Sequence, residues 1–311
     1  MSQKDLFSIV VPVYNSEKSL EILYNRVKEV FEQIGEDFEM VLVDDSSKDK
    51  SYQIMKNLHD TDSRVKIIQM AKNFGQHKAI MCGFKYAGGN FILTMDDDLQ
   101  HPPTEIVKLI DTIRNNPDVD VVIGRYDTKK HNFIRNFGTA VMNKISAYIF
   151  NRDSNLKLTS FRIIRRHVVE AVLEAQTITP RIGSLLLQVS NRIINVEVHH
   201  DERAFGKSGY PFKRLVKDFF NNILNNSDLP LKFLGGVGVL SFIASIGLAI
   251  FYIVRYFVNG VSVAGWTTLI VLILLFSGLI LFSIGLLGNY MIRILKETKK
   301  MPLYAIRDKR L

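Results

Sequence analysis

The chain has 311 residues, a formal net charge of +9 and 47% hydrophobic residues, so it is long enough for one substantial domain plus an accessory part. Cys82 is the only cysteine, which excludes an internal disulfide and suits a reducing compartment. Much of the basic excess lies beside two apolar tracts near the C-terminus, so anionic lipid headgroups explain it more simply than nucleic acid does.

The N-terminal part of the chain alternates apolar, β-rich runs with helical patterns. The expected strands cover residues 7–13, 38–45, 65–70, 90–98 and 120–124, and the expected helices lie near residues 17–34, 49–59, 76–87 and 103–115. This order predicts an α/β domain with a mainly parallel sheet that is covered on both faces. In such a fold, ligands bind at the carboxyl ends of the strands.

Unusual polar residues follow the first two expected strands. Pro12 cannot donate to a sheet ladder and marks the end of the first strand. Beyond it, Tyr14 can stack on a base and Glu17 can accept a hydrogen bond from a base or ribose, although Pro and Tyr are common at strand ends without such a role. The second strand ends at Asp44 and Asp45, where acids routinely cap a following helix. Asp44 directly follows the apolar run, so its side chain is expected in the same crevice as Tyr14.

Three consecutive acids follow the fourth expected strand. Alternation along a strand would place Asp96 and Asp98 on one side and Asp97 on the other, and Gln100 can join the first two across the turn. Two carboxylates, a carboxamide and positions for water suit Mg²⁺ or Mn²⁺, which bind few carboxylates and bridge phosphate oxygens. A metal on a nucleotide diphosphate would stabilise the leaving group, so the expected donor is a group activated on UDP or GDP. A lone D-x-D is weak evidence, and only its place at the sheet edge gives it weight.

Two amphipathic segments follow this domain. Residues 131–150 place apolar side chains along one side of a helix, and residues 210–227 keep the same spacing with a basic opposite face. A helix of this kind can simply cap a core. Its basic face and its place just before an apolar tract favour an interfacial helix over residues 210–229.

The two apolar tracts predict a transmembrane hairpin. Residues 233–254 contain no charged side chain and would form about 33 Å of helix, enough to cross a bilayer core. Residues 256–292 are also uncharged, so the expected spans are about 231–257 and 266–292. Basic residues flank the outer ends of the hairpin, whereas Arg255 stands alone near the connecting loop, which predicts cytoplasmic termini. Two buried helices of a soluble protein are the alternative.

These patterns divide the chain into three predicted parts. Residues 1–209 form a cytoplasmic domain, residues 210–229 form the interfacial helix, and residues 230–311 hold the two transmembrane helices and a basic cytoplasmic tail. The N-terminal apolar run is short and meets a proline, so no cleavable signal peptide is expected.

Five motifs give the chain a family resemblance. They read VPVYN, VDDSS, NFGQHKAIMCGF, MDDDLQHPP and HHDERAFGKSGY. Together they resemble family 2 glycosyltransferases of the Rossmann-like GT-A fold, in particular the membrane-anchored polyprenyl-phosphate sugar transferases. These include dolichol-phosphate mannose synthases and undecaprenyl-phosphate glucosyltransferases, and the undecaprenyl-phosphate formamido-arabinose transferases look most similar. The resemblance covers almost the whole chain, including the hairpin.

The resemblance implies roles for the residues that match the family's motifs. The nucleotide would be held by Pro12, Tyr14, Glu17, Asp44 and Asp96, and the metal by Asp96, Asp98 and Gln100. The acceptor phosphate would be held by Arg125, Arg135, Thr139, Arg203, Lys207 and Ser208. Asp98, Arg125 and Arg203 would act in catalysis. The chain departs from the family by lacking a lysine after Ser208, which puts the role of Lys207 in doubt, and by reading TSFR where mannose synthases read S-G-F.

The acceptor that the resemblance implies needs no strong general base. A polyprenyl phosphate has a second pKa of about 6 and is largely dianionic at neutral pH. The expected reaction is a metal-dependent, inverting transfer of one sugar, with a UDP-sugar favoured as donor, to undecaprenyl phosphate on the cytoplasmic leaflet of a bacterial inner membrane. A processive polysaccharide synthase and a non-catalytic scaffold that binds nucleotide-sugars are the alternatives. The sequence leaves open the sugar, the downstream use of the product and the oligomeric state, a homo-oligomer included.

Overall fold

The computed structural model describes residues 5–126, 156–175, 177–199 and 201, a set of positions between 234 and 258, and residues 265–298 and 302–311. The chain divides into two compact units. One is made of Met1–Gly209 with Met301–Leu311, and the other is made of Tyr210–Lys300.

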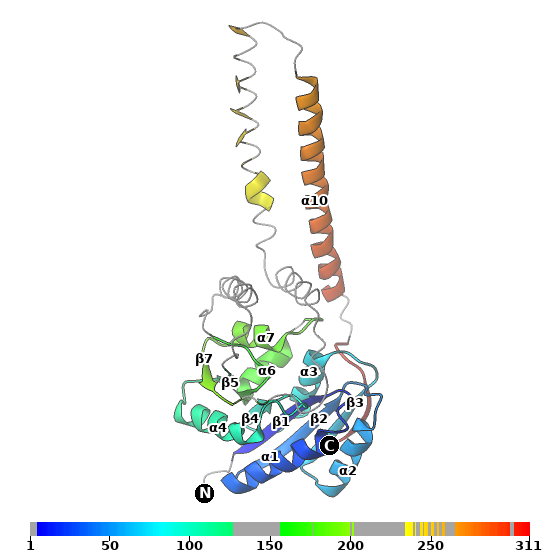
Figure 1. The fold of residues 1–311 in the computed structure, drawn as a ribbon, viewed down its shortest axis with the longest axis vertical. Helices are drawn as coiled ribbons and strands as arrows, with labels where there is room; N and C mark the ends of the chain where they lie inside the picture. Colours follow the sequence, from blue (N-terminus) through cyan, green and yellow to red (C-terminus); the bar gives the residue numbers. More distant parts are fainter. Residues whose placement is uncertain are drawn as a thin grey trace. The chain divides into compact units, whose positions relative to one another are not determined.

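The first unit is built on one mixed sheet (Figure 1). Within the described residues, its strand order is β7-β5-β6-β4-β1-β2-β3-β8. The strands are β1 (Leu6–Val13), β2 (Asp37–Asp44), β3 (Val65–Met70), β4 (Phe91–Thr94), β5 (Val121–Arg125), β6 (Arg162–Arg165), β7 (Ile193–Glu197) and β8 (Ile306–Arg310).

Parallel pairing links β1 to β2 and β4, β2 to β3, and β5 to β7. This confirms the α/β class and the parallel arrangement of the first four expected strands. Two strands run the other way: β6 lies antiparallel between β4 and β5, and β8 lies antiparallel on the outer edge of β3. The sheet is therefore mixed rather than purely parallel.

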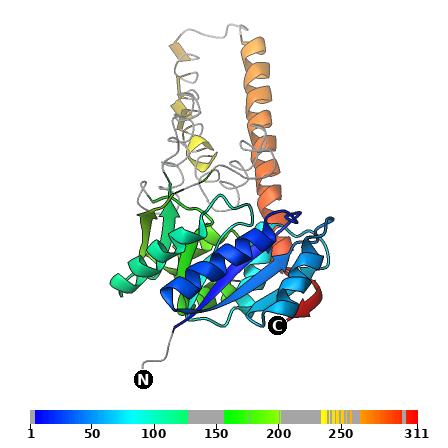
Figure 2. The same ribbon diagram turned by 60° about the horizontal axis from the view of Figure 1, so that its bottom comes forward.

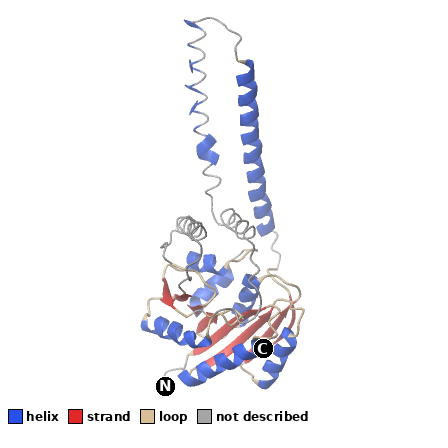
Figure 3. Cartoon of the chain, in the orientation of Figure 1, coloured by secondary structure: helices blue, strands red, loops and turns tan. Residues whose placement is uncertain are grey.

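Helices cover both faces of the sheet, as the sequence predicts (Figures 2 and 3). They are α1 (Leu20–Ile34), α2 (Ser51–Thr61), α3 (Gln76–Tyr86), α4 (Ile106–Asn115), α6 (Arg166–Glu174) and α7 (Ile182–Val189). Successive residues of a strand point to opposite faces. Val11 accordingly packs in the core with α1, α2 and α4, whereas Val10 packs in the core with α3, α6 and α7.

The strand before the three acids is shorter than predicted. The expected strand covers residues 90–98, but β4 ends at Thr94 and the acids follow in a turn. Leu99, just after them, has a φ of 61°. Close like charges and a left-handed residue are both easier to accommodate in a turn than in a ladder, which explains the early end of the strand.

The C-terminal residues also differ from the expected tail, because they form β8 in the first unit. The backbone N–H of Ala71 donates to the carbonyl of Ala305 at 2.8 Å. The Tyr52 hydroxyl donates to Asp308 at 2.7 Å, and Arg310 lies 3.1 Å from Asp60. An exposed edge strand is an aggregation hazard, so covering β3 with these residues protects the sheet.

The second unit contains α10 (Trp266–Thr298), which coincides with the second predicted span. Residues 234–238, in the first predicted span, are helical as well. Within the part of the chain that the structure describes, no helix is both long enough and apolar enough to cross a membrane. The hairpin therefore stays a prediction, and the predicted helices at 131–150 and 210–229 lie outside the described residues.

Candidate active site

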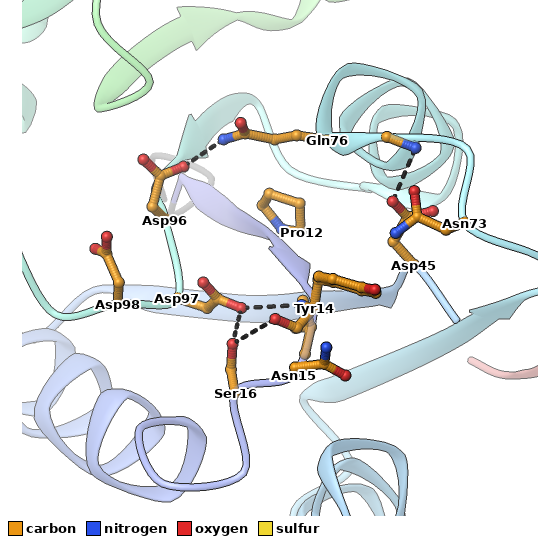
Figure 4. Close-up of a pocket in the computed structure, with 12 residues that line it drawn as sticks. Pro12, Tyr14, Asn15, Ser16, Asp45, Asn73, Gln76, Asp96, Asp97 and Asp98 are labelled. Atoms are coloured by element: carbon orange, nitrogen blue, oxygen red, sulfur yellow. Dashed lines mark hydrogen bonds between the residues drawn. The ribbon is translucent and has the colours of Figure 1, made fainter. Parts of the chain in front are cut away.

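A cavity of about 470 Å³ opens at the carboxyl ends of β1 and β4, next to the start of α3 (Figure 4). It is lined by Pro12, Val13, Tyr14, Asn15, Ser16, Asp45, Asn73, Gly75, Gln76, Asp96, Asp97 and Asp98. Four of the predicted site residues, Pro12, Tyr14, Asp96 and Asp98, are therefore brought together from two strand ends that lie far apart in the sequence.

The loop after β1 presents an aromatic ring to this cavity. The Tyr14 side chain is 46% exposed, so its face is open to a planar ligand. Its backbone N–H donates to Asp97 Oδ2 at 3.1 Å, and the Ser16 hydroxyl donates to the same oxygen. Figure 4 shows Asp97 pointing toward this loop. The middle acid thus ties the aromatic loop to the acidic turn.

Asp96 is held by neutral donors from two other elements. Gln76, the first residue of α3, donates its amide to one carboxylate oxygen at 2.6 Å, and Ser160 donates its hydroxyl to the other at 2.6 Å. Ser160 is placed there because β6 pairs antiparallel with β4, and its carbonyl accepts from the Thr94 hydroxyl at 2.5 Å. The carboxylate is thereby fixed at the cavity wall.

The remaining metal candidates lie on the same turn. Asp98 Oδ1 accepts from the backbone N–H of Gln100 at 3.2 Å, and the Gln100 carbonyl accepts from Asp201 at 2.9 Å. Asp98 lines the cavity, whereas Gln100 is half-buried and does not line it.

The buried acids of this site are costly to ionise. Desolvation raises the pKa of Asp97 to about 6, although the hydrogen bonds from Ser16 and Tyr14 lower it, and the charges of Asp96 and Asp98 add smaller raising contributions. Desolvation likewise raises the pKa of Asp45, although the backbone N–H groups of Phe74 and Gly75 donate to it at 2.6 and 2.8 Å. Several carboxyl groups thus lie close together here, and a bound cation would lower the cost of ionising them.

The donor set fits a hard divalent ion. Among the described residues, no three His, Cys, Asp or Glu side chains gather in a ready-made metal cluster. Asp97 also lines the cavity, but its Oδ2 accepts from both Tyr14 and Ser16, so Asp96 and Asp98 are the candidate carboxylate ligands. Mg²⁺ and Mn²⁺ favour such a site, because they use one or two carboxylates together with water and substrate phosphate oxygens.

Two predicted nucleotide residues lie elsewhere. Glu17 Oε2 accepts from the backbone N–H of Lys50 at 3.1 Å, just before α2. Asp44 is fully buried and accepts from Ser47 at 2.9 Å and from Gln69 at 3.1 Å. Neither lines the cavity, because Asp44 is the last strand residue and turns inward; Asp45 takes its expected place.

Of the predicted acceptor residues, the structure describes Arg125. Arg125 ends β5 and is exposed, with its guanidinium 3.9 Å from Glu197 at the end of the neighbouring β7. Arg135, Thr139, Arg203, Lys207 and Ser208 lie outside the described residues.

Some cavity residues carry no local sequence pattern that marks them. Asn73, Gly75 and Gln76 arrive from the loop after β3, where Gly75 has a φ of 93° that favours glycine. The only sequence hint was that they fall within the NFGQHK motif. Asp97 and Ser160 gain their positions from tertiary contacts, which spacing alone does not reveal.

The comparisons with known proteins agree with this geometry. The model for glycosyl transferase family 2 matches residues 8–173. An uncharacterized glycosyltransferase of Bacillus subtilis, YkcC, is 34% identical over 98% of this chain and 94% of that protein. An undecaprenyl-phosphate 4-deoxy-4-formamido-L-arabinose transferase of Shewanella sediminis is 33% identical over 98% of this chain and 92% of that protein. The crystal structure of glucosyl-3-phosphoglycerate synthase from Mycobacterium tuberculosis has a similar fold, with a TM-score of 0.51 and 14% identity over 71% of this chain and 78% of that one. The chain therefore belongs to glycosyl transferase family 2 and is a glycosyltransferase.

Proposed function

We propose that the protein transfers a single sugar from a nucleoside diphosphate sugar, most simply a UDP-sugar, to undecaprenyl phosphate, with inversion and with the help of Mg²⁺ or Mn²⁺. The observation that carries the proposal is the convergence of Tyr14, Asp96 and Asp98 on one cavity. An open aromatic face suits a base, and two carboxylates suit a metal-bound diphosphate.

The acceptor class is supported by the relatives. Proteins named as undecaprenyl-phosphate sugar transferases are 31–33% identical to this chain over at least 96% of its length. A phosphate acceptor also suits the chemistry of the site. Its oxygen is already ionised at neutral pH, so no side chain has to remove a proton before attack.

The reaction is a displacement at the anomeric carbon. An oxygen of the acceptor phosphate forms the new bond to that carbon, and the bond from the carbon to the β-phosphate oxygen breaks. The electron pair leaves with the nucleoside diphosphate, and one displacement inverts the configuration. Tyr14 orients the base and Asp97 fixes the loop that carries Tyr14. When bound, the divalent ion would be held by Asp96 and Asp98 and would neutralise charge on the leaving diphosphate.

The reaction takes place at a membrane surface. The apolar tracts and their basic flanks support a multi-pass protein of a bacterial inner membrane, with the catalytic domain and both termini on the cytoplasmic side. A long isoprenoid chain has to stay in the bilayer, so a transferase for it needs a membrane surface nearby.

A transfer assay tests the function. The full chain in detergent is incubated with undecaprenyl phosphate, Mg²⁺ or Mn²⁺, and a panel of radiolabelled UDP- and GDP-sugars. We expect one donor to give a labelled lipid that carries one sugar with inverted configuration. A ladder of longer products would favour a processive synthase, and the absence of labelled lipid with every donor would contradict the proposal.

A further inference from the structure

Arg162, Arg165 and Arg166 lie close together in sequence but differ in the hydrogen bonds that their guanidinium groups make. Arg165, at the end of β6, donates to the carbonyls of Val119 at 2.7 Å and Ile113 at 3.0 Å. Arg166 donates to the carbonyl of Gly89 at 2.8 Å. Arg162 is only 4% exposed, and its Nε makes a long contact of 3.5 Å to the Ser160 carbonyl. Among the described residues, Arg162 Nη1 has no hydrogen-bond partner.

Arg162 nonetheless keeps its charge. Desolvation lowers its pKa to about 10, and Asp96 partly opposes that shift. The side chain is therefore protonated at neutral pH. A buried guanidinium with an unused N–H is expensive, since neither water nor a carbonyl compensates for the lost hydration. Such a group is common where a ligand completes the set of partners.

The position of Arg162 connects it to the active site. It pairs with Thr94 across β4 and β6, one residue before the acidic turn begins at Met95 and two residues after Ser160, which bonds Asp96. Ile164, on the same face of β6, packs in the core with α3, α6 and α7. The charge of Arg162 also reaches the first turn of α3, where desolvation and then Arg162 and Arg181 lower the pKa of His77 to about 4.

Both oxygens of Asp96 already accept hydrogen bonds from the neutral donors Gln76 and Ser160. The site thus combines acids, which suit a metal, with a buried guanidinium that has spare donor capacity. Phosphate is the ligand chemistry that uses both, because its oxygens bridge to a metal and accept from arginine.

We propose that Arg162 is a binding residue for a substrate phosphate, which it contacts through its unpartnered Nη1. This inference rests on the proposed function. The phosphate can come from the diphosphate of the donor or from the headgroup of the acceptor, and the nearness of Asp96 favours the donor.

Calorimetry with the full chain tests the inference. Arg162→Gln removes the charge, Arg162→Lys keeps it without the planar fork, and Arg165→Lys is the matched control on the same strand. With Mn²⁺ present, we expect Arg162→Gln to weaken UDP binding by about tenfold to a hundredfold and Arg162→Lys to weaken it less. Uridine binding should not change in either variant, because it lacks the phosphates. Arg165→Lys should bind UDP and uridine as the wild type does.

A second arm separates the two sources of phosphate. The KM for undecaprenyl phosphate is measured in the same variants at saturating donor. Weaker UDP binding assigns Arg162 to the donor, and a raised KM for the lipid with unchanged UDP binding assigns it to the acceptor. The inference is overturned if Arg162→Lys leaves both UDP binding and the KM for undecaprenyl phosphate unchanged. This outcome is decisive even if Arg162→Gln does not fold. The proposed function is tested separately. If the wild type transfers the sugar and the Arg162 variants behave like it, only this inference is wrong. If UDP binding depends on Arg162 but the wild type transfers no sugar, only the proposed function is wrong.

Discussion

The two ends of the sheet treat buried acids in opposite ways. At the amino end, Glu39 lies beside Lys66 at 2.7 Å and accepts from the Ser8 hydroxyl at 2.6 Å and from the backbone N–H of Gly88. Burial opposes its ionisation, but the hydrogen bonds from Gly88, Lys66 and Ser8 prevail and hold the pKa of Glu39 below its ordinary value.

At the carboxyl end of the sheet, the effect of burial on the pKa outweighs the effect of the hydrogen bonds. Asp45 and Asp97 accept hydrogen bonds from neutral donors, and desolvation raises the pKa of each. The contrast separates stability from function. At the amino end, the buried acid is paired with a lysine and stabilises the fold. At the carboxyl end, an excess of negative charge remains that a metal ion bound with a diphosphate can offset.

The largest expected effect comes from removing an acid of the carboxyl end. Asp98→Ala should lower the transfer rate by about a thousandfold, because charge on the leaving diphosphate is no longer neutralised. The thermal midpoint should stay near that of the wild type, since Asp98 does not stabilise the core. Single-turnover transfer measures the rate, and a melting curve measures the thermal midpoint. Wild-type turnover by this variant would contradict the proposed role of Asp98.

The next effect concerns the amino end. Glu39→Gln should cost about 1–3 kcal/mol of unfolding free energy, because Lys66 loses its buried partner. The exposed pair of Lys28 and Glu32 offers the control, and Glu32→Gln should change stability by less than about 0.5 kcal/mol.

Acid should remove the contribution of Glu39. Its folded pKa is depressed, so its stabilisation is present above the ordinary value of 4.5 and disappears as the pH falls through the folded pKa. Denaturant unfolding of the wild type and Glu39→Gln should therefore converge below that pH. Parallel curves at all pH values would show that Glu39 does not act through its charge.

A smaller effect is expected at the aromatic loop. Tyr14→Ala should weaken UDP binding by about tenfold, because stacking on a base contributes roughly 1–3 kcal/mol. Tyr14→Phe retains the ring and should bind UDP like the wild type. Equal affinity of all three proteins for UDP would mean that the base lies elsewhere.

The smallest effect is a change of stability without ligand. The folded pKa of Asp97 is raised to about 6, so its stabilising contribution is lost as the pH rises through that value. Asp97→Asn cannot ionise and should melt about 2 °C above the wild type at pH 7.5 in chelator. The difference should shrink at pH 5, and a constant difference would contradict the charge explanation.

The sequence predicts the strands that form by simple apolar runs and fails where pairing is long-range. β1 to β4 follow alternation between strand and helix, and the structure has them in parallel order. β6 reads RIIR and β8 reads IRDKR, so neither looks like a strand until a neighbouring edge is known. Both are antiparallel additions to the edges of strands predicted correctly.

The same limit applies to the site. The convergence of Tyr14, Asp96 and Asp98 on one cavity was predictable, because all three lie in turns that follow strands ending at the common edge. Asp44 and Glu17 also follow strands, but Asp44 accepts from Ser47 in its own turn and Glu17 accepts from Lys50 in the loop before α2. Asp97, Gln76 and Ser160 depend on which loops meet in three dimensions, and no spacing along the chain encodes that contact.

The most direct test of the central claim is binding of Mn²⁺ measured by electron paramagnetic resonance. Addition of the full chain to Mn²⁺ with UDP should reduce the free-ion signal below that of Mn²⁺ with UDP alone, and Asp98→Ala should leave it at the level of Mn²⁺ with UDP alone. The account predicts that the loss of signal requires both UDP and Asp98. Equal loss with Asp98→Ala, or no loss with the wild type at saturating UDP, would contradict it.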